Sequence, residues 1–258
     1  MFFKRHPLEL KIYILRALHL LRENVMIKLK KSKVLGRMIR QDSTEELAKP
    51  TWTLVREAIQ AGKVDEALIF LDYGYGEAKT VHDSICSFVD DVLTRLAGFG
   101  EEEIYKALRK RYEPVIRRWL SDTPGVEESL QRGIEYQRGH GGNCTITEES
   151  DRYVVRFDPC GSGGQLKRNK DVGVVKKAYP WTWGKSCVPY YCTHCCVMWE
   201  ILPTELRGYP IRIHLISDKP ADPCIILYYK RPELIPKEYF TRIGLSPQSG
   251  NIRSGRGI

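Results

Sequence analysis

The amino-acid sequence predicts an α+β protein in which a helical region precedes a cysteine-rich part with a small antiparallel sheet. Apolar residues recur at helical spacing as far as residue 138, and short β-branched and aromatic segments replace them after Gly139. Seven of the eight cysteines also lie beyond residue 143. We therefore expect four parts: a basic amphipathic segment (1–40), a helical region (41–138), a cysteine-rich α+β region (139–245) and a disordered tail (246–258).

The composition is that of a globular protein, with 28% charged and 42% hydrophobic residues among 258. No apolar run reaches the roughly 18–20 residues that cross a bilayer. The first six residues lack the pattern of a secretory signal, so we expect a cytoplasmic protein. Residues 1–40 hold eleven Lys and Arg against two Glu, which accounts for the whole net charge of +9. The remainder is neutral, which argues against a nucleic-acid partner.

Residues 8–31 are expected to form a basic amphipathic helix. Seven apolar residues recur at helical spacing: Leu10, Tyr13, Ile14, Ala17, Leu18, Leu21 and Val25. Such a stripe most often packs on its own domain or on a second copy. With its lysines it also suits the surface of an anionic membrane, where the protein would be peripheral. A third alternative is an organellar targeting peptide, although the segment contains Glu9 and Glu23.

The helical region predicts five helices, which are separated by glycines, prolines and polar breaks. Gly74 and Gly76 separate the second from the third, and Pro114 should kink or split the fourth. The expected ranges are 52–61, 64–72, 77–97, 101–120 and 126–138.

Strands are expected after Gly139. Residues 145–147 and 153–157 flank a turn and predict a hairpin, and residues 211–216 and 224–229 are two further strands. Residues 172–175 form a weaker candidate because Gly173 interrupts the valines. A short helix is expected to begin in the stretch Tyr190–Glu200 and to end at Pro203.

That stretch carries the chemistry. Cys192 and Cys195 have the C-x-x-C spacing that lets two thiolates bind one ion, although redox dithiols share this spacing. The chain has no second C-x-x-C, so further ligands must come from elsewhere. Cys160 is the best third ligand, since it precedes a glycine-rich loop whose N–H groups can face an anion or a sulfur. We expect zinc, with an iron–sulfur cluster less favoured because no ferredoxin-like run is present.

The fourth coordination position stays open. The candidates are His140, His194, Cys187, Cys224 and water, whereas Cys196 is expected to face the core. Three cysteines and a water would make a catalytic Lewis acid, and four protein ligands would make a structural clip.

The candidate acid–base residues are His82, His140 and Glu200. Asp158 is a further candidate base or orienting group.

The motifs Asp-Pro-Cys-Gly-Ser-Gly-Gly (158–164), Tyr-Tyr-Cys-x-His-Cys (190–195) and Gly-Tyr-Pro (208–210) resemble those of the L-2-amino-thiazoline-4-carboxylic acid hydrolase-like proteins of prokaryotes. The resemblance covers the C-terminal half and, less well, the helix around residues 81–83. It implies an enzyme that opens a C–N or C–S bond in a small ring, with Cys160, Cys192 and Cys195 at its centre. The basic N-terminal 40 residues depart from that group.

The sequence therefore favours a zinc-dependent hydrolase that acts on a small, amide-like or cyclic metabolite. One alternative is a non-catalytic small-molecule-binding or sensor protein with a structural zinc or thiol site. Another is a metal-free enzyme in which Cys160 is a nucleophile paired with a histidine.

Overall fold

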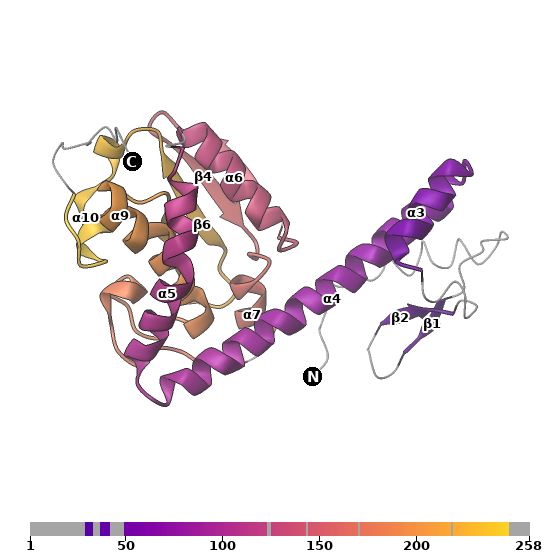
Figure 1. Ribbon diagram of the computed structural model, residues 1–258, viewed down its shortest axis with the longest axis horizontal. Helices are drawn as coiled ribbons and strands as arrows, with labels where there is room; N and C mark the ends of the chain where they lie inside the picture. Colours follow the sequence, from indigo (N-terminus) through magenta and orange to yellow (C-terminus); the bar gives the residue numbers. More distant parts are fainter. Residues whose placement is uncertain are drawn as a thin grey trace. The chain divides into compact units, whose positions relative to one another are not determined.

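The α+β fold is confirmed in a computed structural model of the protein (Figure 1). It describes residues 29–32, 37–41, 49–122, 125–142, 144–169, 171–217 and 219–247. The chain divides into two compact units, Met1–Val81 and His82–Ile258. The predicted helix at 8–31 lies outside the described residues except for its last three, Leu29–Lys31, which form a strand instead. Among the described residues, no helix combines the length and the apolar character needed to cross a membrane.

The first unit contains a two-stranded antiparallel ribbon, β1 (Leu29–Lys31) and β2 (Met38–Arg40), followed by α3 (Thr51–Gln60). Helix α4 (Val64–Ala97) begins in this unit and ends in the second. The prediction of two helices here was wrong, because α4 continues through Gly74 and Gly76. A Cβ at Gly74 would lie 3.2 Å from the Thr51 methyl group, so this glycine permits close packing of α3 rather than a break.

In the second unit, α5 (Glu101–Trp119) and α6 (Val126–Arg138) follow α4. Pro114 does not split α5, contrary to one expectation from the sequence. An interior proline costs a helix about 3 kcal/mol. The completely buried Ile104 and Ile116 on either side offset this, since each contributes roughly 1.5–3 kcal/mol through burial.

The sheet of this unit has the strand order β3-β4-β6-β5, and all neighbouring strands are antiparallel. The strands are β3 (Cys144–Glu148), β4 (Arg152–Phe157), β5 (Ile213–Leu215) and β6 (Cys224–Tyr229). Side chains alternate between two apolar clusters: Val155, Ile226 and Tyr228 belong to the main core, whereas Ile213 and Leu227 belong to a smaller one. The weak candidate at 172–175 makes only an isolated bridge from Val174 to Pro189.

The stretch that carries the cysteines folds as a series of short helical turns. They are the 3₁₀ turn η2 (Tyr190–Cys192), α8 (Thr193–Cys196), the π-helical turn η3 (Val197–Ile201) and α9 (Leu202–Arg207). Helical structure continues past Pro203, contrary to the sequence prediction, because this proline lies in the first turn of α9, where its missing N–H is tolerated. The glycine-rich loop after Cys160 opens α7 (Gly163–Asn169), and α10 (Lys237–Thr241) precedes Arg242.

Candidate functional site

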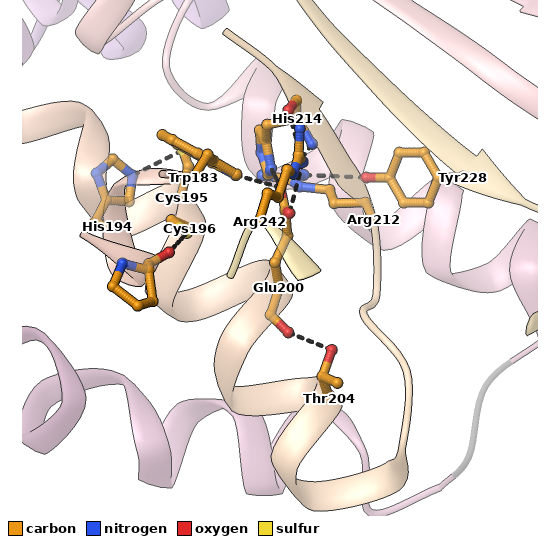
Figure 2. Close-up of polar contacts among 11 residues, drawn as sticks. Trp183, His194, Cys195, Cys196, Glu200, Thr204, Arg212, His214, Tyr228 and Arg242 are labelled. Carbon is orange, nitrogen blue, oxygen red and sulfur yellow. Dashed lines mark hydrogen bonds and ion pairs between the residues drawn. The ribbon is translucent and has the colours of Figure 1, made fainter. Parts of the chain in front are cut away.

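Glu200 is a buried carboxylate in the second unit. It lies on η3, its side chain is fully buried, and both of its carboxylate oxygens accept hydrogen bonds (Figure 2). Oε1 accepts from Trp183 Nε1 at 2.7 Å and from the His214 backbone N–H at 2.8 Å. Oε2 accepts from Arg242 Nη2 at 2.7 Å.

Burial raises the pKa of Glu200, but hydrogen bonds from His214 and the charge of Arg242 outweigh this, so that the pKa lies below its ordinary value. The carboxylate is therefore ionised at neutral pH. Glu200 provides a buried negative charge whose position is set by three neighbouring side chains.

His214 is held by this carboxylate. Its Nδ1 lies 3.2 Å from Glu200 Oε1, and the side chain is 1% exposed. Donation from Nδ1 to the carboxylate leaves Nε2 as the reactive nitrogen of the ring. Nε2 has no hydrogen-bond partner at ordinary distance among the described residues. The charge of the ring nevertheless lowers the pKa of the Cys195 thiol.

The Cys195 thiol, which is partly buried at the end of α8, is in contact with a second histidine: its Sγ lies 3.5 Å from His194 Nε2. Burial opposes ionisation of this thiol, but the charges of His194 and His214 and the contact with His194 place its pKa well below the ordinary value. The surroundings of Cys195 therefore favour its thiolate form.

His194 is oriented by the backbone. Its Nδ1 donates to the Tyr191 carbonyl at 2.5 Å, which directs Nε2 toward the sulfur. Burial lowers the pKa of His194, whereas the Cys195 charge and hydrogen bond and the Tyr191 carbonyl raise it, with a net increase. The pair therefore favours the thiolate–imidazolium form.

The other predicted thiols lie near Cys195 but differ from it chemically. Burial and the charges of Cys160, Cys195 and Cys224 raise the pKa of Cys192 well above its ordinary value. Burial and the charges of Cys160 and Cys195 likewise raise the pKa of Cys224. The Cys160 sulfur accepts a hydrogen bond from the Gly164 N–H at 3.1 Å, and a Cβ at Gly163 would lie 2.7 Å from the Cys192 sulfur. The glycine-rich loop is therefore needed for the close approach of these sulfurs.

Within the described residues, no group of three or more His, Cys, Asp or Glu side chains is arranged to hold a metal ion. The zinc ligands predicted from the sequence, Cys160, Cys192 and Cys195, stay a prediction.

His82 and His140, two of the predicted acid–base residues, are brought together. His82 Nε2 lies 2.7 Å from His140 Nδ1, and the buried Cys86 sulfur lies 3.6 Å from the same nitrogen of His82. Cys86 also lies 3.4 Å from the Tyr191 hydroxyl, which connects this pair to the segment that carries His194. Burial and the charges of His82 and His194 lower the pKa of His140 to about 4, so it is neutral at physiological pH.

Comparison of the chain with models of known protein families, curated proteins and solved structures gives no match.

Three further residues considered from the sequence, Asp158, Cys187 and Cys196, also belong to the second unit. Asp158 is exposed and pairs with Arg168 at 2.5 Å, and Cys187 is exposed. Cys196 is completely buried, which confirms the expectation that it faces the core.

Sequence reasoning did not connect His214, Trp183 or Arg242 with Glu200. The signal for His214 was present: it alternates with Ile213 and Leu215 in a strand, and a histidine facing the core side of a strand needs a polar partner. Trp183 and Arg242 carried no comparable local signal.

Proposed function

We propose that this protein is a hydrolase that cleaves a C–N or C–S bond of a small, amide-like or cyclic metabolite, with the Cys195 thiolate as nucleophile. The observation that supports this is one partly exposed thiol that contacts His194 and whose pKa is also lowered by the charge of His214, a histidine held by a buried, ionised carboxylate. A nucleophile, a base and a group that orients the base are the three parts of a nucleophilic site.

His214 is suited to be the general acid and base. Glu200 accepts from its Nδ1, which fixes the tautomer and stabilises the imidazolium that forms during reaction. His194 makes its second contact with a neutral backbone carbonyl and is better suited to stabilise the resting thiolate. The proposal therefore assigns proton transfer to His214 and the low thiol pKa to both rings.

In the first step, the Cys195 sulfur forms a bond to the electrophilic carbon of the substrate. The carbon–nitrogen or carbon–sulfur bond breaks, and the leaving atom takes the proton of the His214 imidazolium. In the second step, water gives a proton to neutral His214 and adds to the acyl carbon. The carbon–sulfur bond to Cys195 then breaks, which releases the acid and restores the thiolate and imidazolium.

The test is alkylation of the purified protein by iodoacetamide over a range of pH, with the modified cysteine identified by peptide mass spectrometry. Because only the thiolate reacts, Cys195 should be labelled rapidly at pH 6 and lose reactivity only as the pH falls through its lowered pKa. His214→Gln and His194→Gln should each shift the pH profile of Cys195 labelling upward.

Cys192 is the internal control, since its raised pKa predicts slow labelling throughout the same pH range. If Cys195 follows the pH profile of an ordinary thiol, or is labelled no faster than Cys192 at pH 6, Cys195 is not the nucleophile.

Zinc-dependent hydrolysis is the second candidate. The observation that favours it is the proximity of Cys160, Cys192, Cys195 and Cys224, which is close enough for their charges to raise the pKa values of Cys192 and Cys224. A bound cation would favour the thiolate form of these cysteines, because its charge offsets their mutual repulsion. Zinc accepts up to four thiolate ligands.

Elemental analysis of purified protein separates the two candidates. Under the thiolate proposal, Cys195 stays reactive to iodoacetamide after treatment with a chelator, and Cys160→Ser leaves the metal content unchanged. Zinc at one ion per chain that is lost in Cys160→Ser, together with a Cys195 protected until chelation, would instead support the zinc site.

A further inference from the structure

Arg212 is a buried cation without a counter-ion. Its side chain is 1% exposed, yet no carboxylate in the described part of the chain pairs with it. Nη1 donates to the Tyr228 hydroxyl at 3.0 Å, and the guanidinium lies 4.0 Å from the centre of the Trp199 ring. Nε and Nη2 are buried and have no hydrogen-bond partner among the residues that the structure describes. A buried charge with unsatisfied donors costs several kcal/mol, so its presence points to a partner that binds there.

The two unsatisfied nitrogens define the chemistry of that partner. Nε and Nη2 form one edge of the planar guanidinium, and their two N–H groups are parallel. That edge matches the two oxygens of a carboxylate in a bidentate pair. The third nitrogen is already used by Tyr228, and the Trp199 ring covers one face of the group. Arg212 is therefore held rigidly with its bidentate edge unpaired.

Arg212 is close to the thiolate site. It stands two residues before His214, just ahead of β5, and both side chains contact residues of the main apolar cluster: Arg212 contacts Trp199 and Tyr228, and His214 contacts Trp183. Figure 2 shows the two side chains from this segment together with the hydroxyl of Tyr228. The charge of Arg212 also lowers the pKa values of His194 and His140, so that it acts within the same cluster as Cys195.

Tyr136 lies beside this position at the surface. It is 42% exposed, and its ring centre lies 6.1 Å from that of Trp199, the ring over which the Arg212 guanidinium lies.

We propose that Arg212 binds a carboxylate of the substrate through Nε and Nη2 and so places the reacting carbon at Cys195. This inference rests on the proposed function and adds a substrate class, namely small carboxylates. Arg212 would be a specificity residue that contacts the substrate at a distance from the bond that breaks.

The experiment compares two alkylating agents that differ in charge. Iodoacetate carries a carboxylate and iodoacetamide a neutral amide, and both transfer a similar group to sulfur. The ratio of their second-order rate constants at Cys195 should fall about tenfold or more in Arg212→Lys, equivalent to 1.4 kcal/mol. The rate with iodoacetamide should change less than about twofold. Lysine keeps the positive charge and removes only the bidentate edge.

Arg207→Lys is the matched control. Arg207 is also largely buried and lies over an aromatic ring, that of Tyr209, but it donates to two backbone carbonyls. Arg207→Lys should leave the ratio of the iodoacetate and iodoacetamide rate constants unchanged. An unchanged ratio in Arg212→Lys, with rapid iodoacetamide labelling, would overturn the carboxylate site and leave the nucleophile intact. Slow labelling by both reagents at pH 6 would instead count against the proposed function.

A second measurement does not depend on Cys195. Sodium acetate should raise the Tm of the unmodified protein relative to sodium chloride at equal ionic strength, because a ligand that binds only the folded state stabilises it. The increase should be lost in Arg212→Lys and kept in Arg207→Lys. Equal Tm values in the two salts would contradict a carboxylate site at Arg212.

Discussion

Glu200→Gln is expected to lower the free energy of unfolding by about 3 kcal/mol, as is usual when one partner of a buried ion pair is removed. Both carboxylate oxygens accept hydrogen bonds from N–H groups, so an amide NH₂ at either position would face a donor. Arg242 would also lose its counter-charge. Urea denaturation of the variant and the unmodified protein measures the difference.

The same substitution should impair the thiolate. Without the carboxylate, the His214 ring loses the acceptor that fixes its tautomer and orientation, so it should lower the Cys195 pKa less. We therefore expect slower labelling by iodoacetamide at pH 6 in Glu200→Gln. The control is Glu205→Gln, which removes an exposed pair with Arg109 and should cost no more than about 1 kcal/mol without altering the labelling. If Glu200→Gln lowered the free energy of unfolding no more than Glu205→Gln does, the buried carboxylate would not be a fixed structural charge.

Gly133→Ala is expected to destabilise the protein by about 2 kcal/mol, even though alanine favours a helix by about 1 kcal/mol relative to glycine. A Cβ at this position in α6 would lie 2.0 Å from the hydroxyl oxygen of Tyr228, whose ring is 1% exposed and has little room to move. Displacement of Tyr228 would also remove its hydrogen bond to Arg212. Thermal or urea denaturation measures the effect.

Gly76→Ala is the matched control, because Gly76 is also helical and a Cβ there would meet nothing within 4 Å. It should stabilise the protein by roughly 0.5–1 kcal/mol. In a Tyr228→Phe background, which lacks the clashing oxygen, Gly133→Ala should cost measurably less than in the unmodified protein. Equal costs in the two backgrounds would exclude the Tyr228 hydroxyl as the cause.

Local patterns were sufficient to predict most of the described elements. Apolar periodicity located α3, α5 and α6, and short β-branched runs located β3, β4 and β6, because burial of one face determines both patterns. Glycines and prolines were less informative, since their effect depends on what packs against them. Gly74 allows a close contact and Pro203 begins a helix, and neither outcome is written in the neighbouring sequence.

The candidate site shows the same limit. The sequence drew attention to Cys195 and Glu200, which lie on adjacent turns, but suggested no reason to connect them with His214 or Arg242. Those contacts come from β5 and from the residue after α10, and only tertiary packing brings them together. Which of several neighbouring thiols is ionised depends on burial and on nearby charges, and no spacing rule contains that information.

The π-helical turn that follows Cys195 and contains Glu200 makes the site depend on the backbone conformation of this segment as well as on the identity of its residues. In an α-helix, side chains five positions apart point about 140° away from each other. The wider turn of η3, with its i to i+5 hydrogen bonding, reduces this angle and brings the thiol and the carboxylate toward the same side of the helix. If the same residues formed a regular α-helix, Glu200 would rotate away from the thiol while every functional side chain remained in the sequence.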